Sequence, residues 1–467
     1  MDFKRVSAMV LAMLLCLSVA SCGGSGDKPT DPQKPTTTKQ QGEAGGQSEQ
    51  TTIEYIVSTE KVEITAPGGS VIATQIQTVT QTKTNPTTKK PSGGTTTAQK
   101  TTGKVESTTV KVPATTEEDE GNVVYTALSE DKYRNYSLLS ASQKQMYTKI
   151  KNAIANLDTE VDLGNCTQAE IKIVYTAVSE DNPILVWAPR GYSMTFSGGN
   201  CTLKLKYDYT KAQCDQMKKE METAVANAFS AIKGSKDQYK TELRLHDYMV
   251  SKVTYKATSN LSYTAYGALV EGNAVCEGYS RAMQMLLNRA GIECSLVTGK
   301  SKNQGHMWNI VKIDGQWYHL DATWNDANNK GYHSYFNLSD TMILIGHQMD
   351  GSIKTNAASV PQSFNFDLPD CNSMAANYCN KIGTLVDSKQ DFENKALNYF
   401  KNHTIKSGTV VEFCFSSKYD RLFESSMKDI SDFISKYNSS VSKDKKIPSS
   451  YSISGTTGFK GFMVTFK

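Results

Sequence analysis

Two stretches of the sequence decide the fold: GNAVCEGYSRAMQMLLNRAG at residues 272–291 and HMWNIVKIDGQWYHLD at residues 306–321. In the first stretch, the apolar residues after Cys276 recur at helical spacing and stop at Gly291, a residue type that commonly ends helices. We therefore expect a helix with Cys276 in its first turn. At that position the helix dipole and the free backbone N–H groups favour a thiolate and can donate to an oxyanion. A buried structural cysteine is the alternative.

The second stretch predicts a β-hairpin, because Asp-Gly at residues 314–315 lies between two strand-like runs and is typical of a type I′ turn. This turn pairs Ile313 with Gln316. The same register makes His306 and Asp321 diagonal neighbours on one face, roughly 7–8 Å apart along the backbone. A shift of one residue would place them on opposite faces. The sequence thus supplies a thiol, a base and a carboxylate that orients the base, which are the three roles of a nucleophilic triad.

Three motifs carry a resemblance to a known family: VCEGY at residues 275–279, GHMWN at residues 305–309 and HLDATW at residues 319–324. In residue type, in order and in the strand placement of the last two, they resemble the motifs of the transglutaminase-like superfamily. The resemblance covers residues 246–335 and implies a papain-like α+β core that transfers acyl groups through a cysteine thioester. It implies Cys276 as nucleophile, His306 as general base and acid, and Asp321 as the orienting carboxylate, with no cofactor.

Other residues of this region leave alternatives open. The family's side-chain oxyanion donor has no obvious counterpart, and the candidates are Tyr255, Tyr263 and Tyr266. His319 shares the active face, where we expect a satisfied core or cleft histidine rather than a second catalytic one. No cysteine or histidine pair has the spacing of a zinc site. The Asp- and Asn-rich run at residues 321–329 lacks the glycine and terminal glutamate of a calcium loop.

Two more expectations concern tryptophans and cysteines. We expect Trp308 and Trp317 in the core of a half-buried sheet, with a substrate groove as the alternative. Cys371 and Cys379 could pair, although scattered free thiols are the simpler interpretation.

The N-terminus predicts export. Two basic residues precede an apolar run at residues 6–20, which is the anatomy of a secretory signal rather than of a spanning helix. The VASC sequence at residues 19–22 resembles the end of a bacterial lipoprotein signal. We therefore expect residues 1–21 to be a signal peptide and Cys22 to be the lipidated residue, with an ordinary cleaved signal as the alternative. The expected location is extracytoplasmic, anchored to the bacterial cell membrane by lipid.

Composition divides the rest of the chain. Residues 22–120 are rich in Thr, Pro and Lys and poor in apolar residues, so we expect a disordered tether. The run at residues 53–57 resembles a strand, but its neighbours offer it no partner. An N-terminal α+β domain is expected at residues 121–235, the catalytic core at 236–352 and a C-terminal α+β domain at 353–467.

Periodicity within these parts predicts individual elements. Helices are expected at residues 140–157, 167–178, 210–232 and 237–253, and a strand is expected at residues 184–188. The predicted fold class is α+β, with a papain-like transglutaminase core flanked by two smaller α+β extensions.

Net charge excludes one class of partner. The formal charge is only +4, from 51 basic and 47 acidic residues, which argues against a nucleic-acid binder. We predict a monomeric thiol acyl-transfer enzyme at the cell surface that acts on peptide or carboxamide bonds of peptide or protein substrates in the cell envelope. A peptidase or amidase is favoured over a protein-glutamine transferase. A non-catalytic surface module that binds peptide or glycan is the alternative of a different class.

Overall fold

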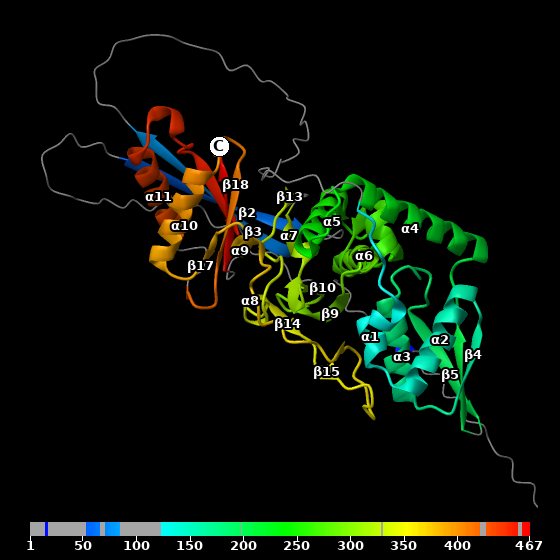
Figure 1. The fold of residues 1–467 in the computed structure, drawn as a ribbon. Helices are drawn as coiled ribbons and strands as arrows, with labels where there is room; N and C mark the ends of the chain where they lie inside the picture. Colours follow the sequence, from blue (N-terminus) through cyan, green and yellow to red (C-terminus); the bar gives the residue numbers. More distant parts are fainter. Residues whose placement is uncertain are drawn as a thin grey trace, which may run out of the picture.

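The computed structural model describes residues 15–16, 53–65, 71–84, 123–197, 199–327, 330–420, 426–455 and 460–467. Helices and strands are mixed throughout, and Figure 1 shows three groups of them, with the green middle of the chain between the other two. The predicted α+β class is confirmed. The domain boundaries at residues 121, 236 and 353 stay predictions. Among the described residues, no helix is long and apolar enough to cross a membrane.

The N-terminal group packs helices against an antiparallel sheet. Its strands lie in the order β1-β5-β6-β4. Three of the helices begin where the sequence predicts, at Ser140, Thr167 and Thr210, each of which closes a capping box with the glutamine or glutamate three residues on. The elements of this group are η1 (Glu130–Lys132), α1 (Arg134–Leu138), α2 (Ala141–Asn156), β4 (Glu160–Gly164), α3 (Gln168–Asp181), β5 (Gly191–Ser197) and β6 (Asn200–Leu205), with β1 (Leu15–Cys16) on β5. Helix α4 (Lys211–Ala231) follows β6 and packs mainly against the core of the middle group.

The strand expected at residues 184–188 is wrong. The backbone instead makes two successive turns, in which Leu185 N donates to the Asn182 carbonyl at 3.0 Å and Ala188 N donates to the Leu185 carbonyl at 2.9 Å. Apolar side chains of this segment pack against two separate cores, so the run is apolar without being extended. This segment forms part of a cleft described below.

The middle group is a four-stranded antiparallel sheet in the order β11-β10-β9-β14, with α6 packed against β9 and β10. The predicted hairpin register is confirmed, since Ile313 pairs with Gln316 and Asn309 with Leu320. The group comprises α5 (Gln238–Lys252), β7 (Thr254–Tyr255), η2 (Asn260–Tyr263), η3 (Gly267–Glu271), β8 (Asn273–Ala274), α6 (Cys276–Arg289), β9 (Cys294–Ser301), β10 (Gln304–Ile313), β11 (Gln316–Leu320), α7 (Ala322–Asn325), β12 (Asp326–Ala327), β13 (Lys330–Gly331), α8 (Asp340–Ile343) and β14 (His347–Met349).

The C-terminal group is built on a six-stranded sheet in the order β17-β18-β20-β19-β3-β2. Two of its strands come from the segment expected to be a disordered tether. The expectation that residues 53–57 have no partner is wrong, because residues 71–84 pair with them and then with β19. The elements are β2 (Ile53–Thr65), β3 (Val71–Thr84), α9 (Tyr378–Lys381), β17 (Leu385–Val386), α10 (Lys389–Asn402), β18 (Val410–Phe415), α11 (Met427–Ser440), η5 (Lys443–Lys445), β19 (Tyr451–Gly455) and β20 (Gly461–Phe466).

Other parts of the predicted N-terminal segments lie outside the described residues. These are residues 1–14, 17–52, 66–70 and 85–122, which include the predicted lipidation site Cys22.

A connecting segment returns from the middle group to the N-terminal group. It contains β15 (Ser352–Ile353) and β16 (Asn365–Phe366), which pair in parallel. Phe364 and Phe366 are buried in the N-terminal core, and Asn365 accepts a hydrogen bond from Thr298 N of β9 at 2.8 Å. The segment therefore joins the N-terminal group to the sheet of the middle group.

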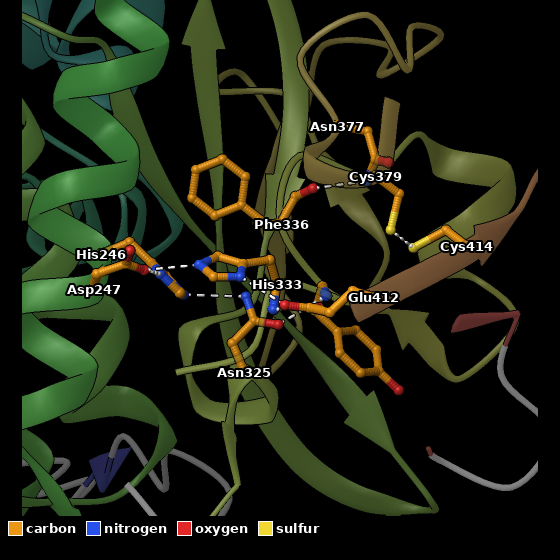
Figure 2. Close-up of polar contacts among 10 residues, drawn as sticks. His246, Asp247, Asn325, His333, Phe336, Asn377, Cys379, Glu412 and Cys414 are labelled. Carbon is orange, nitrogen blue, oxygen red and sulfur yellow. Dashed lines mark hydrogen bonds and ion pairs between the residues drawn. The ribbon is translucent and has the colours of Figure 1, made fainter. Parts of the chain in front are cut away.

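A buried polar cluster joins the middle group to the C-terminal sheet (Figure 2), and we call it the His333 cluster. His333 Nε2 lies 2.8 Å from Asp247 of α5, and His333 Nδ1 lies 2.8 Å from Glu412 of β18. Burial alone would lower the pKa of His333, but the two carboxylates raise this pKa to about 10, so the ring is an imidazolium. The cluster continues to α7, because Asn325 Nδ2 donates to His246 Nε2 at 3.1 Å and His246 Nδ1 lies 2.9 Å from Asp247.

Cys371, Cys379 and Cys414 are free thiols in the structure, as the simpler interpretation of the sequence expects, and the alternative pairing of Cys371 with Cys379 is wrong. The Sγ of Cys379 lies 2.6 Å from the Sγ of Cys414 on β18 (Figure 2). Cys371 Sγ instead donates to the Pro369 carbonyl at 3.8 Å. The fold thus brings together two cysteines that are 35 residues apart in sequence.

Candidate active site

Cys276 is the first residue of α6, as predicted, and it is buried with 6% of its surface exposed. The preceding turn is fixed by η2, because Val275 N donates to the Ser262 carbonyl at 3.0 Å. Gly278 belongs to the same close approach, since a Cβ at this position would lie 2.5 Å from the Ser262 oxygen. Because Gly278 has no side chain, η2 can pack closely against the first turn of the helix that carries the thiol.

His306 and Asp321 meet as the hairpin register predicts. His306 Nε2 lies 2.7 Å from Asp321 Oδ2, and their side chains are 8% and 0% exposed. Strand β11 ends at Leu320, so Asp321 lies just beyond the ladder and caps α7 by accepting a hydrogen bond from Trp324 N at 3.0 Å. Because Nε2 is engaged by the carboxylate, Nδ1 is the nitrogen of His306 that remains to exchange a proton with a thiol.

A third side chain reaches the same carboxylate. His347, the first residue of β14, lies with its Nε2 2.9 Å from Asp321 Oδ2 and is fully buried. Burial would raise the pKa of Asp321, but its contacts with His306 and then with His347 hold that pKa well below its usual range. Asp321 is therefore ionised and accepts hydrogen bonds at both oxygens.

The thiol and the imidazole open onto one cleft. Cys276 and His306 both line it. Another wall comes from the N-terminal group and the connecting segment, with apolar side chains from Leu185, Val186, Ala188 and Phe364. Residues 184–188, which were expected to form a strand and instead form two turns, thus contribute to a wall of the cleft.

Charged side chains also line the cleft. Arg281 donates to Glu277 Oε1 at 2.9 Å, and Arg190 lies 3.7 Å from Glu277 Oε2. Glu180 is partly buried, and desolvation raises its pKa to about 7 even though Arg281 opposes the shift. The cleft therefore offers cations and carboxylates beside its apolar wall.

The structure separates the three tyrosines considered as oxyanion donors. Tyr263, at the end of η2, lines the cleft and lies under the Arg190 guanidinium at 5.0 Å. Tyr266 instead donates to Glu220 at 2.5 Å. Tyr255 packs against Tyr279 with ring centroids 6.1 Å apart. Among these three, only Tyr263 borders the cleft that holds Cys276.

His319 is held away from the thiol as a satisfied core histidine, as expected. Its Nδ1 accepts from Trp308 Nε1 at 3.0 Å, and its Nε2 lies 2.8 Å from Asp340. Trp308 is fully buried, which confirms the core expectation, and Trp317 is partly buried beside Arg134.

Three groups of described residues bring three metal-ligating atoms within 4.8 Å of one another. One is the site itself, formed by His306, Asp321 and His347, and the others belong to the His333 cluster and to the surroundings of His319. In each group, direct hydrogen bonds already join histidine nitrogens to carboxylate oxygens. These bonds engage histidine and carboxylate atoms that a metal ion would otherwise ligate.

His347 is the site residue that sequence reasoning missed. It lies 26 residues beyond Asp321 and has no neighbouring motif. Its position depends on the pairing of β14 with β9, in which His347 lies opposite Ser301. No short-range pattern in the sequence predicts that a three-residue strand adds to this edge of the sheet, so His347 could not be assigned to the site from its own neighbours.

Comparisons with known proteins match the part of the chain that holds these residues. The model of the transglutaminase-like superfamily matches residues 225–322. Kyphoscoliosis peptidase from Homo sapiens and from Mus musculus is 33% identical over 64 residues, which covers 11% of this chain and 10% of the relative. The chain thus spans only a tenth of the length of these curated relatives.

Two solved structures are also similar. A TGase aligns with a TM-score of 0.25 and 17% identity over 40% of this chain and 58% of its own. A candidate cysteine protease from Cytophaga hutchinsonii aligns with a TM-score of 0.21 and 18% identity over 37% of this chain and 70% of its own. The matched residues 225–322 contain Cys276, His306 and Asp321, and this part of the chain belongs to the transglutaminase-like superfamily.

Proposed function

We propose that the protein is a thiol acyl-transfer enzyme in which Cys276, His306 and Asp321 form the catalytic triad. The observation that carries the proposal is the shared cleft: Cys276 at a helix N-terminus and His306, bound to a buried carboxylate, line the same hollow. The helix N-terminus favours the thiolate form of Cys276, and an imidazole held by a carboxylate can receive and return a proton.

The reaction begins when the Cys276 thiolate attacks the carbonyl carbon of a peptide or carboxamide. The C–S bond forms, and the carbonyl electron pair moves to the oxygen. The helix N-terminus offers the Cys276 backbone N–H to this oxyanion, and Tyr263 is the side chain that we propose as its second donor. The support for Tyr263 is its position on the cleft beside Cys276.

His306 then donates a proton to the departing amine as the C–N bond breaks, which leaves a thioester on Cys276. Water attacks the thioester while His306 accepts the water proton, the C–S bond breaks, and the acid and the thiolate are regenerated. An amine in place of water gives transfer instead of hydrolysis. Throughout, Asp321 stays ionised and stabilises the imidazolium.

We favour hydrolysis of peptide or carboxamide bonds over cross-linking. Two of the similar proteins bear names of this kind, a peptidase and a candidate cysteine protease. A cleft with an apolar wall and both signs of charge suits a peptide chain, which presents apolar and charged side chains together. The enzyme is proposed to act as a monomer at the cell envelope, after export and lipidation at Cys22.

The test is the reactivity of one thiol. The rate of iodoacetamide alkylation at Cys276, mapped by mass spectrometry across pH, should show a thiol that reacts well below the usual cysteine pKa of about 8.5. Cys294 is the internal control, because burial raises its pKa well above the ordinary value. If Cys276 reacts only near pH 8.5, the proposed enzymatic function is refuted. A non-catalytic module that binds peptide or glycan then becomes the better explanation.

Turnover then decides between the reactions. A peptide library incubated with and without a primary amine should be hydrolysed at equal rates with no amine adduct. C276S should lose the activity and C294S should retain it. If the amine is incorporated into the peptide, the proposed reaction is acyl transfer and not hydrolysis.

A further inference from the structure

We propose that His347 is a positioning residue of the triad, which holds Asp321 in the orientation that His306 needs. The inference rests on the proposed function and extends it to a fourth side chain. The sequence motifs end at residue 324, and His347 arrives from a separate strand.

The geometry places two imidazoles on one oxygen. Asp321 Oδ2 lies 2.7 Å from His306 Nε2 and 2.9 Å from His347 Nε2, and the two rings have their centroids 5.3 Å apart. The other oxygen, Oδ1, accepts from Trp324 N at 3.0 Å. Three donors therefore fix the plane of the carboxylate, and His347 supplies the one that comes from outside the hairpin and its helix.

The protonation of His347 follows from its surroundings. Its Nδ1 is buried and has no hydrogen-bond partner among the described residues. Burial lowers the pKa of His347, although Asp321 opposes this, so the ring is neutral and carries one proton. That proton belongs on Nε2, where a carboxylate oxygen accepts it, because on Nδ1 it would be buried without an acceptor.

A neutral second donor suits a positioning role. His347 holds Oδ2 without adding a positive charge that would compete with the imidazolium formed on His306. Its ring is wedged against Trp308, Trp324 and Tyr335, with centroid distances of 5.0, 6.2 and 5.7 Å. Aromatic packing thus fixes the donor, and the donor fixes the carboxylate.

The test compares H347Q with H347N in the full chain. The longer glutamine amide can place an N–H where Nε2 lies, whereas the asparagine amide falls short of Asp321. With a peptide substrate, H347N should lose about 10- to 100-fold in kcat with little change in KM, the usual effect of removing a partner that orients a reacting group. H347Q should recover most of the loss. H319Q is the matched control, since it changes a buried histidine of the same sheet that does not touch Asp321.

A second readout separates this role from a general loss of packing. In carbon-13 NMR titrations, the pKa of the Asp321 carboxyl should rise in H347N and stay low in H347Q and H319Q. Equal loss of kcat in H347N and H347Q, or an unchanged Asp321 pKa in H347N, would overturn the inference. An ordinary Cys276 thiol in the wild type would refute the proposed function alone, because the Asp321 titration does not depend on turnover.

An independent observation carries a second inference: we infer that Cys379 and Cys414 are a site of disulfide formation. Both cysteines are fully buried, and their sulfurs are in direct contact (Figure 2). Thr384 holds the two backbones together, since its N donates to the Cys379 carbonyl at 2.7 Å and its carbonyl accepts from Cys414 N at 3.3 Å.

The reaction needs a disulfide oxidant, either a dithiol oxidase or oxidised glutathione. One cysteine thiolate attacks the oxidant's S–S bond, and one oxidant thiolate leaves. The second cysteine displaces the other oxidant thiolate from the mixed disulfide, and the two cysteine protons end on the two oxidant sulfurs. Because both sulfurs are buried and burial raises the pKa of Cys379, the exchange takes place while the chain folds.

Refolding the full chain with oxidised and reduced glutathione tests this inference. After alkylation in denaturant, peptide mapping should recover Cys379 and Cys414 as one disulfide-linked pair, and a reductant should lower the Tm. C371S should keep this reductant-sensitive shift and C414S should lose it. Recovery of Cys379 and Cys414 as separate alkylated peptides would overturn the inference.

Discussion

The imidazolium of His333 makes a stability contribution whose pH dependence follows from its two carboxylate contacts. The folded pKa of about 10 lies above the ordinary histidine value of 6.5. A raised pKa stabilises the fold fully below the unfolded value, and this contribution is lost as pH rises through the folded value. The stabilisation should therefore be complete below pH 6.5, decline between pH 6.5 and 10, and be absent above.

The size of the effect can be bounded. A difference between 6.5 and about 10 corresponds to roughly 5 kcal/mol, at about 1.4 kcal/mol for each pKa unit. The Asp247 side chain is 36% exposed, whereas that of Glu412 is only 6% exposed, so solvent screens one of the two contacts. We therefore expect about 2–4 kcal/mol at neutral pH.

Thermal and urea unfolding of the wild type and of H333Q between pH 6 and 10 checks this expectation. H333Q should be less stable at pH 6, and the difference between the two proteins should shrink as pH rises. The double variant H333Q/E412Q is the control, because it removes the uncompensated buried carboxylate as well as the cation and should be more stable than H333Q. Parallel stability curves for wild type and H333Q from pH 6.5 to 10 would refute a charged His333.

Four further predictions concern the site and its anchor. D321N should lower kcat by about 10³- to 10⁴-fold, because an amide NH₂ cannot accept from the two imidazoles that meet at Oδ2, and single-turnover acylation measures this loss. Y263F should lower kcat by about 10- to 100-fold in a peptide hydrolysis assay, whereas Y266F, whose hydroxyl is bound to Glu220, should not. G278A should destabilise the fold by about 1–3 kcal/mol in urea unfolding, since its Cβ would lie 2.5 Å from the Ser262 oxygen. C22A should appear in the culture medium instead of the membrane fraction on immunoblots, and membrane retention would contradict lipidation there.

Local sequence signals predicted the parts of the site that depend on one helix and one hairpin. Cys276 begins its helix, and the Asp-Gly turn sets the register that brings His306 to Asp321. Helical periodicity likewise predicted where the helices at Ser140 and Thr167 begin. In each case the deciding interaction spans only a few residues of sequence.

Long-range pairing accounts for what sequence reasoning missed. His347 lies in the site because β14 pairs with β9, and the sequence of this short strand does not by itself predict that pairing. Residues 53–57 looked unpartnered because the neighbouring apolar content is low, yet residues 71–84 supply the partner and β19 supplies the sheet. Backbone hydrogen bonding can order such polar, β-branched runs when a sheet edge is available, and composition alone does not reveal that edge.

The wrong strand at residues 184–188 has a functional consequence. An extended, fully buried strand would have belonged to the interior of the N-terminal group, away from the thiol. Two consecutive turns instead leave Leu185, Val186 and Ala188 partly exposed on the cleft that Cys276 and His306 line. The N-terminal group thereby contributes a wall of the candidate active site, so substitutions in residues 185–188 should change KM for peptide substrates more than kcat. Equal effects on both would mean that this wall acts on the reacting groups instead of on substrate binding.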